Sequence, residues 1–283
     1  MTDVPTYQQV VECKQLTEIE RLIDLEKLKL YEATDNRICR AGNAYIYHYM
    51  LDHIMRTRPK NHESLYDVYH KGSEGGTEKL AQEVLRRRGT LRPKDIFEVY
   101  RVNRGCVAVF APSTAKYLYK LFGATSVLDP CSGWGGRMLA AHSLGIRYTG
   151  MDTNLSLQLP YHQMMSELSD PNLTMMWGDC LKQNFADVDY DLVLTSPPYV
   201  NVELYEHMKP WAGRKDYTDN FLIPLLNKCL AHCKGKYVCF NISPEMYEDL
   251  LKANYREANL KICFPQRIRM GKDKQHKIYV WFK

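Results

Sequence analysis

The feature that most constrains the fold is an apolar run that leads through a glycine-rich loop into a helix-forming segment. Residues 125–129 predict a buried strand, residues 130–136 read Pro-Cys-Ser-Gly-Trp-Gly-Gly, and residues 138–144 predict a helix. The glycines let the backbone take up positive φ angles and pass close to a ligand. Their spacing does not fit the six-residue dinucleotide fingerprint, and the Lys-Ser/Thr of a phosphate-binding P-loop is missing. The loop therefore suits a ligand with a nucleoside and an amino-acid tail.

Acidic residues end the next two predicted strands. Residues 147–152 predict a short strand that ends in Asp152, and residues 173–179 predict another that ends in Asp179. Open α/β sheets bind ligands beyond the carboxyl ends of their strands. A carboxylate at the end of the second strand can accept hydrogen bonds from two vicinal ribose hydroxyls, and Asp179 can accept one from an adenine amine. A helix cap or a turn is the alternative role for each acid.

The segment Thr-Ser-Pro-Pro-Tyr at 195–199 follows the apolar run 192–194 and predicts a turn at the end of a buried strand. Consecutive prolines have no N–H group and a fixed φ, so the carbonyl of Pro197 is available to a ligand. Ser196 offers a second acceptor, and Tyr199 offers a flat ring that can stack on a base. This combination suits the planar amine of a nucleobase. An ordinary turn that closes a strand is the alternative.

The remainder of the C-terminal half predicts further strands and helices of the same sheet. Residues 219–233 predict a helix and residues 237–240 a strand. Ser243 and Pro244 have the residue types of a helix N-cap and first turn. The last two predicted strands form an antiparallel hairpin, at residues 260–264 and 278–282.

Two regions are expected. Residues 106–283 predict an α/β fold with a seven-stranded mixed sheet flanked by helices, and residues 1–105 predict a mainly helical extension for substrate or partner recognition. In the extension, one helical stripe is either a core face or a partner-binding face; it comprises Leu16, Ile19, Ile23 and Leu30.

From about residue 106 onward, the chain resembles the S-adenosylmethionine-dependent amino-methyltransferases of nucleic-acid bases, the family of cytosine-N4 and adenine-N6 DNA methyltransferases. The resemblance rests on the loop 129–136, Asp152, Asp179 and the turn 196–199, in that order. Ser at the first position of the turn is more typical of cytosine-N4 enzymes. The resemblance implies a Rossmann-like class I methyltransferase fold and methyl transfer to an exocyclic amine, at cytosine N4 before adenine N6.

The resemblance also implies roles for individual residues. Segment 110–118 resembles the part of the family that holds the methionine carboxylate of the cofactor, S-adenosyl-L-methionine. The implied cofactor-binding residues are Phe110, Ser113, Thr114, Asp129, Cys131, Ser132, Gly133, Trp134, Gly135, Asp152, Thr153, Asp179 and Cys180. The implied catalytic residues are Ser196, Pro197, Pro198 and Tyr199. Transfer is expected to be direct, to a base flipped from its stack, without a covalent enzyme intermediate.

Two basic clusters predict contacts with nucleic-acid phosphates. The first cluster is Arg86, Arg87 and Arg88, and the second is Arg267, Arg269, Lys272 and Lys274. Solvated surface is the alternative, because a net charge of +5 over 283 residues is only mildly basic. Both clusters flank the predicted sheet, which favours a nucleic-acid partner, and the resemblance implies DNA before RNA. The N-terminal helices are the expected surface for a homodimer or a partner subunit.

Length and composition indicate an intracellular protein, cytoplasmic or nuclear, with one catalytic domain and an addition. No apolar run approaches the ~18–20 residues that span a bilayer, and the polar start is no secretory signal. Nine cysteines without a Cys-x-x-Cys pair favour a reducing compartment. Cys229, His232 and Cys233 lie one helical turn apart, but without a fourth ligand nearby they predict packing residues rather than a metal site.

Three other activities are compatible with these residues. The same fold with a related turn methylates guanine amines in structured RNA, or glutamine amides in proteins, the latter usually with Asn before the prolines. The third alternative is a non-catalytic, cofactor-binding subunit that supports a partner enzyme. The complete glycine loop and the Ser-Pro-Pro-Tyr turn favour a catalytic chain.

Overall fold

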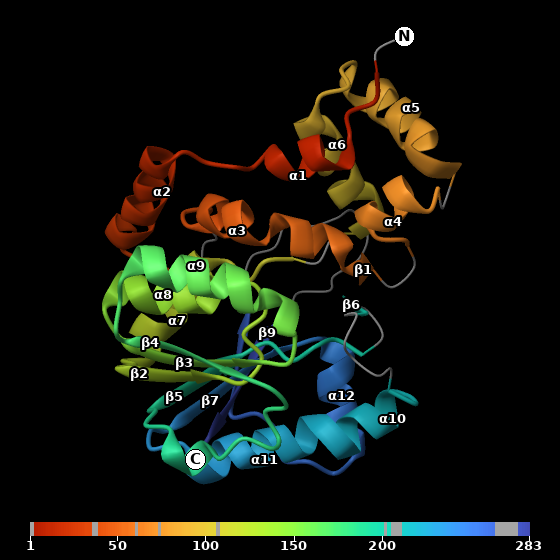
Figure 1. Cartoon of the computed structure of the whole chain (residues 1–283). Helices are drawn as coiled ribbons and strands as arrows, with labels where there is room; N and C mark the ends of the chain where they lie inside the picture. Colours follow the sequence, from red (N-terminus) through yellow and green to blue (C-terminus); the bar gives the residue numbers. More distant parts are fainter. Residues whose placement is uncertain are drawn as a thin grey trace.

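The computed structural model combines a central sheet with a helical unit packed along one side of it (Figure 1). The structure describes residues 3–35, 39–59, 62–72, 75–105, 108–200, 203–204, 211–263 and 277–283. Within these residues, the strands of the main sheet are β2 (Ser126–Asp129), β3 (Arg147–Asp152), β4 (Leu173–Trp177), β5 (Leu192–Thr195), β7 (Tyr237–Ile242), β8 (Leu260–Cys263) and β9 (Lys277–Phe282).

The sheet has seven strands in the order β4-β3-β2-β5-β7-β9-β8. Strand β9 runs antiparallel to β7 and β8, and the other neighbouring pairs are parallel. This arrangement confirms the predicted α/β fold with a seven-stranded mixed sheet flanked by helices. The strand order reverses direction between β2 and β5, so the carboxyl ends of these two strands form a topological switch point, where open α/β sheets bind ligands.

Helices cover both faces of the sheet (Figure 1). One face carries α7 (Pro112–Phe122), α8 (Gly136–Leu144) and α9 (Gln158–Leu168), and the other carries α11 (Ile223–His232) and α12 (Pro244–Lys252). Successive residues of a strand point to opposite faces. Val127 packs with the first set of helices and Leu128 with the second, and the same division separates Leu192 from Val193. Both faces of the central strands are therefore buried, as a parallel sheet requires.

The helix predicted at residues 219–233 begins earlier than its apolar pattern indicates. A short helix, α10 (Arg214–Tyr217), continues through a π-helical turn, η5 (Thr218–Leu222), into α11. The first turn of α10 carries polar side chains, which is why the apolar period does not mark it. The predicted start of α12 is correct, because the Ser243 hydroxyl accepts a hydrogen bond from the Met246 N–H at 3.2 Å.

The N-terminal residues are mainly helical, as predicted. Their helices are α1 (Tyr7–Glu12), α2 (Glu18–Leu30), α3 (Asn43–Arg56), α4 (Leu65–His70), α5 (Gly76–Arg88) and α6 (Pro93–Tyr100), followed by a π-helical turn, η2 (Arg101–Gly105). Short 3₁₀ turns, η3 (Leu155–Leu157) and η4 (Phe185–Asp187), complete the inventory of described helices. None of the helices in the described part of the chain is long and apolar enough to cross a membrane.

The helical unit shares its apolar core with the sheet. Tyr45 of α3 is fully buried in the same cluster as Val127 of β2, and the Tyr49 hydroxyl donates to Glu167 of α9 at 2.6 Å. Lys116 of α7 donates from Nζ to the last carbonyls of α2, at Leu28 (2.7 Å) and Lys29 (2.8 Å). These contacts fix α2 and α3 against the helices that cover the sheet.

A second, two-stranded sheet joins the helical unit to the segment that follows the Ser-Pro-Pro-Tyr turn. Strand β1 (Arg58–Pro59) pairs with β6 (Glu203–Leu204) in an antiparallel arrangement, with Arg58 opposite Leu204. Figure 1 shows this pair where the helical unit meets the sheet. The backbone of the helical unit is thus bonded directly to the C-terminal half of the chain.

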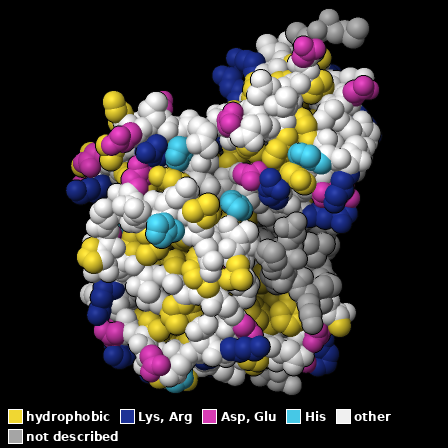
Figure 2. All heavy atoms as spheres, in the orientation of Figure 1, with side chains coloured by type: hydrophobic (Ala, Val, Ile, Leu, Met, Phe, Trp, Pro, Cys, Tyr) yellow, Lys and Arg dark blue, Asp and Glu magenta, His cyan; other side chains and the backbone are white. Residues whose placement is uncertain are grey.

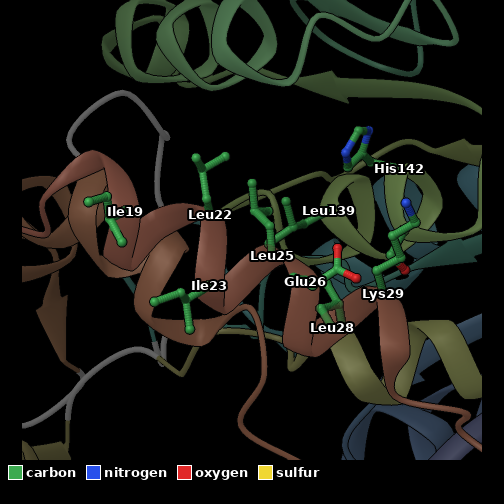
Figure 3. Close-up of a pocket in the computed structure, with 10 residues that line it drawn as sticks. Ile19, Leu22, Ile23, Leu25, Glu26, Leu28, Lys29, Leu139 and His142 are labelled. Carbon is green, nitrogen blue, oxygen red and sulfur yellow. The ribbon is translucent and has the colours of Figure 1, made fainter.

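The apolar stripe of α2 is not a core face. Ile19 and Leu30 are each 70% exposed and Ile23 is 47% exposed, so the core interpretation of the stripe is wrong for these three residues. The helix packs instead through Leu28, which is fully buried. An open groove of about 550 Å³ runs between α2 and α8, with Leu22 of α2 along one side and residues of α8 along the other (Figure 3).

Gly150 of β3 provides a test of this packing. A Cβ at this position would lie 2.5 Å from Sδ of Met175 and 2.8 Å from the ring of Tyr148, and it would also collide with the Ser132 hydroxyl. We expect Gly150→Ala to lower the free energy of unfolding by about 1–3 kcal/mol, because the crowded strands must shift. Thermal unfolding measures the effect.

Gly213→Ala is the matched control for Gly150→Ala. Gly213 has an extended φ of 168°, and no heavy atom of a described residue lies within 4 Å of an added Cβ. The melting temperature of the Gly213→Ala variant should equal that of the unsubstituted protein. Equal melting temperatures for both variants would contradict the close packing described at Gly150.

Candidate active site

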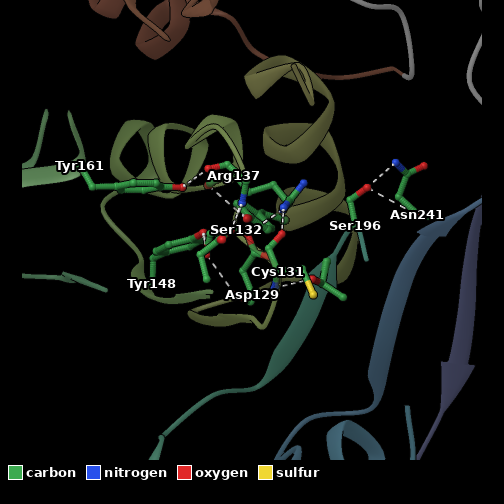
Figure 4. A network of polar contacts seen from close by, with 12 residues as sticks. Asp129, Cys131, Ser132, Arg137, Tyr148, Tyr161, Ser196 and Asn241 are labelled. Atoms are coloured by element: carbon green, nitrogen blue, oxygen red, sulfur yellow. Dashed lines mark hydrogen bonds and ion pairs between the residues drawn. The ribbon is translucent and has the colours of Figure 1, made fainter. Parts of the chain in front are cut away.

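A buried ion pair holds the glycine loop against the sheet (Figure 4). Oδ2 of Asp129, at the end of β2, accepts from Nε of Arg137 at 2.6 Å and from the Tyr148 hydroxyl at 2.7 Å. Arg137 also donates to the carbonyl of Cys131 at 2.5 Å, and its guanidinium lies 5.0 Å from the centre of the Phe110 ring. Although burial alone lowers the pKa of Arg137, the Asp129 carboxylate raises it overall. The Arg137 guanidinium therefore stays charged and holds the glycine loop in place.

The rest of the loop is held by backbone contacts to neighbouring strands and helices. Ser132 donates its N–H to the carbonyl of Met151 at 2.9 Å, and the Tyr161 hydroxyl donates to the carbonyl of Gly133 at 3.1 Å. Gly133 has a φ of +58°, and within the described part of the chain an added Cβ would meet no heavy atom within 4 Å. The backbone at Gly133 thus borders open space, which leaves room for a ligand beside the loop.

Asp152 lies at the carboxyl end of β3, next to this open space. Its Oδ2 accepts from the Gly133 N–H at 2.8 Å, and its Oδ1 accepts from the Asn154 N–H at 2.9 Å. Burial raises the pKa of Asp152 to about 6, although these two N–H groups lower it. Each carboxylate oxygen has a further lone pair, so the side chain retains capacity for hydroxyl donors. The neighbouring Thr153 is exposed.

The loop after β4 is a compact turn. Oδ1 of Asp179 accepts from the Leu181 N–H at 2.9 Å, which is the turn role considered for this acid. Nζ of Lys228 on α11 donates to the carbonyls of Cys180 (3.2 Å) and Leu181 (2.6 Å), and also to that of Gln183. Asp179 is half-buried and Cys180 is buried. Both residues therefore lie in a fixed loop at the carboxyl edge of the sheet.

The Ser-Pro-Pro-Tyr turn follows β5, and the last residue of β5 is bonded to the glycine loop. Oγ1 of Thr195 accepts from the Cys131 N–H at 3.1 Å. Oγ of Ser196 accepts from Nδ2 of Asn241 at 3.0 Å, and its hydroxyl faces the Asn241 carbonyl at 3.5 Å (Figure 4). Pro197 is buried, and Tyr199 packs on the apolar cluster beneath α11. The structure thus brings together two motifs that are far apart in the sequence.

The segment before the glycine loop also reaches this region. Gly136 has no room for a Cβ because the Phe110 carbonyl lies against it, so α8 starts in contact with Phe110. Ser113 and Thr114 are buried in the first turn of α7. The Ser113 hydroxyl donates to the carbonyl of Cys39 at 2.7 Å and accepts from its N–H at 3.2 Å. Ser113 therefore fastens the helical unit to α7.

Several residues of the site were not singled out from the sequence. Arg137 and Tyr148 hold the glycine loop, and Thr195 and Asn241 hold the turn. Arg137 directly follows the last glycine, which is a local signal. Asn241 lies just beyond the strand predicted at residues 237–240, and only the pairing of β5 with β7 brings it to Ser196.

The first basic cluster is not brought to the turn. Arg86, Arg87 and Arg88 form the last turn of α5, which lies at the outer end of the helical unit in Figure 1. The second cluster lies outside the described residues. On the face drawn in Figure 2, the described Lys and Arg side chains alternate with Asp and Glu side chains and form no single basic patch.

The cysteines of α11 pack as predicted. Cys229 and Cys233 are fully buried among the apolar residues on that face of the sheet, whereas His232 is exposed. In the described ranges, no three His, Cys, Asp or Glu side chains are grouped closely enough to hold a metal ion. The two cysteines therefore belong to the apolar core, and His232 belongs to the surface.

Comparisons with solved structures find similar folds. TrmN from Thermus thermophilus is 18% identical, with a TM-score of 0.46 over 61% of this chain and 48% of that chain. An RNA methyltransferase from Salinibacter ruber, in complex with S-adenosyl-L-homocysteine, is 13% identical, with a TM-score of 0.40 over 62% of this chain and 93% of that one. A dimethyladenosine transferase from Plasmodium falciparum is 17% identical, with a TM-score of 0.41 over 61% and 62%.

The similarity is limited in extent. The chain spans about half the length of TrmN, 48%. No family model matches the sequence, and no curated protein matches it. The activity of the chain is therefore inferred from its own residues.

The ion pair between Asp129 and Arg137 yields a stability prediction. Both side chains are almost completely buried, at 0% and 3% exposure. Arg137→Leu leaves the Asp129 carboxylate without its cation, and loss of one partner of a buried pair costs about 3–5 kcal/mol. Urea denaturation measures the change in the free energy of unfolding.

The double variant Arg137→Leu with Asp129→Asn separates charge from packing. Asn keeps an acceptor for the Tyr148 hydroxyl but removes the uncompensated charge. The double variant should therefore be more stable than Arg137→Leu alone. A double variant that is less stable than the single one would show that the charge is not the cause.

Proposed function

We propose that this chain is an S-adenosylmethionine-dependent methyltransferase that acts on the exocyclic amine of a nucleic-acid base, first cytosine N4 in DNA and second adenine N6. One observation carries the proposal. The glycine loop after β2 and the Ser-Pro-Pro-Tyr turn after β5 lie side by side at the switch point, joined by the bond from Cys131 to Thr195. A cofactor bound at the loop therefore adjoins a base bound at the turn.

The residues around the loop fit this cofactor. The Asp152 carboxylate has lone pairs for the two ribose hydroxyls, and the Gly133 backbone borders open space. Asp179 and Cys180 lie in the next loop along the same edge, where the adenine ring is proposed to bind. Phe110, Thr114 and Trp134 complete the proposed set near the methionine tail. When bound, S-adenosylmethionine supplies an electrophilic methyl group on its sulfonium.

The turn holds the amine in place. Ser196 is fixed by Asn241, which donates to Oγ at 3.0 Å, and a second lone pair of Oγ is free to accept from an amine hydrogen. The Pro197 carbonyl accepts the other hydrogen, and Tyr199 stacks on the base. Two acceptors orient the amine for in-line attack, and the amine loses a proton after transfer.

The N-terminal unit is proposed to contribute to substrate recognition. Pairing of β1 with β6 supports this, because it connects the unit to the segment directly after the base-binding turn. Phosphate contacts are assigned to the two basic clusters. The cluster on α5 lies far from the Ser-Pro-Pro-Tyr turn. A nucleic acid that contacts this cluster and the turn together therefore extends along the helical unit.

Methyl transfer tests the proposal directly. We expect purified protein to transfer label from methyl-labelled S-adenosylmethionine to unmodified genomic DNA, and mass spectrometry of the digested nucleosides should identify N4-methylcytosine. N6-methyladenine, or a labelled base in total RNA, would keep the mechanism and change the substrate. Absence of transfer to either nucleic acid by a protein that binds the cofactor would contradict the proposal.

Variants of the turn show whether it is the active site. Ser196→Ala removes an acceptor for the amine, and Tyr199→Ala removes the stacking ring. Each should lower kcat by about 100-fold, because the amine is no longer held in line. Calorimetry should give unchanged cofactor affinity for both variants. Transfer at the unsubstituted rate in both would remove the turn from the mechanism.

The raised pKa of Asp152 predicts a pH dependence of cofactor affinity. With a pKa of about 6, against an ordinary 3.8, the side chain is mostly protonated at pH 5 and ionised at pH 8. Only the ionised form accepts from both ribose hydroxyls. Cofactor affinity should therefore rise about tenfold between pH 5 and pH 7, as the ionised fraction does.

Asp152→Asn is the control for this titration, since its side chain carries no charge. Its affinity, measured by calorimetry over the same range, should be weaker and nearly constant. A variant with the same pH dependence as the unsubstituted protein would show that another group titrates.

A further inference from the structure

Two buried donors lie in the segment 211–217, just before the short helix α10 and at its end. Tyr217 is fully buried at the end of α10, and its hydroxyl has no hydrogen-bond partner in the described ranges. The same holds for the buried indole Nε1 of Trp211, again counting the described residues only. The two rings meet edge to face, with centres 5.4 Å apart, and both contact Phe221.

The Tyr217 hydroxyl belongs to the active-site region. Burial raises its pKa, and the groups that add to this rise are Cys131, Tyr199 and Cys180. These three neighbours come from the glycine loop, the base-binding turn and the loop after β4. Trp211 and Tyr199 pack on the same apolar cluster, to which Tyr217 belongs. Tyr217 therefore packs in the apolar cluster that Cys131, Cys180 and Tyr199, one from each of these loops, also contact.

An unpaired buried donor is unusual and calls for an explanation. Most buried polar atoms in folded proteins have a partner, because desolvation without a new hydrogen bond costs free energy. The backbone next to Tyr217 is also unusual, since the π-helical turn η5 begins at Thr218, and such turns are frequent at functional sites. A ligand that supplies an acceptor would satisfy the hydroxyl.

We propose that Tyr217 and Trp211 donate hydrogen bonds to the acceptor edge of the target base and thereby select cytosine. This inference rests on the proposed function. Beside its amine, cytosine presents two acceptors in succession, N3 and O2, whereas adenine presents N1 and then a C–H. Ser196 and the Pro197 carbonyl accept from the amine, and the indole and the phenol donate to the two acceptors. The set of two acceptors and two donors matches cytosine alone among the amino bases.

Tyr217→Phe tests the proposal because it removes only the hydroxyl. Tyr190→Phe is a matched control: Tyr190 is also fully buried, and its hydroxyl has no partner among the described residues. Tyr190 precedes β5, at the opposite end of that strand from Ser196, beside Cys229 and Cys233. Neither variant loses a hydrogen bond to a described residue, so neither should have a lower melting temperature.

The measurements are kcat/KM for an oligonucleotide with cytosine or adenine as the only amino base, together with calorimetric cofactor affinity. We expect Tyr217→Phe to lower kcat/KM for cytosine by about tenfold or more, because a site built for a hydrogen bond discriminates through it. The ratio of kcat/KM for cytosine to kcat/KM for adenine should also fall, while cofactor affinity stays constant. Tyr190→Phe should match the unsubstituted protein in every readout.

Trp211→Phe provides a second, independent variant, since it keeps an aromatic ring and removes the N–H. Trp211→Phe should also lower the ratio of kcat/KM for cytosine to kcat/KM for adenine. Unchanged cytosine transfer and an unchanged ratio in both active-site variants would overturn the inference. Faster transfer to adenine than to cytosine by the unsubstituted protein would overturn it and leave the methyltransferase proposal standing. Absence of transfer to any nucleic acid would overturn both.

Discussion

The arrangement of the site depends on one buried ion pair, between Asp129 and Arg137. Its two charges lie at the end of β2 and in the first turn of α8, so the pair fixes the loop between them from both sides. Arg137 also holds the Cys131 carbonyl, and the N–H of the same residue bonds to Thr195 of the neighbouring strand. Because a buried charge without its partner is costly, the pair holds the loop in one conformation. The position of the Ser-Pro-Pro-Tyr turn follows from that conformation.

Most of the sheet could be predicted from the sequence because its signals are local. Apolar runs marked the strands, glycines marked the loop, and Ser243 with Pro244 marked the start of α12. What could not be predicted depends on contacts between distant segments. The Asp129 carboxylate, expected near the cofactor, is bonded to Arg137 and Tyr148, and the Ser113 hydroxyl is bonded to Cys39. The exposure of Ile19 on α2 likewise depends on which side of the helix meets α8, which no periodicity reveals.

The acceptors of the proposed base site could be predicted from the sequence, whereas its donors could not. Ser196 and Pro197 occur in a recognisable motif, so sequence reasoning finds them. Tyr217 and Trp211 belong to no motif, and their polar atoms attract notice only because the fold buries them without partners. Asn241 is an intermediate case, since it follows a predicted strand but gains its role through the pairing of β5 with β7. The proposed specificity residues are therefore harder to find from the sequence than the proposed catalytic ones.

The small β1–β6 ribbon has a consequence for how such a chain can be re-engineered. Deletion of residues 1–105 would remove the partner strand of β6 and expose the apolar side chains that Tyr45 and its neighbours cover. The unpaired strand edge and the exposed apolar surface would favour aggregation. The two regions are therefore not interchangeable modules. A chimera in which another unit replaces the N-terminal helices has to supply a strand that pairs with residues 203–204 as well as an apolar surface that packs against the helices of the sheet.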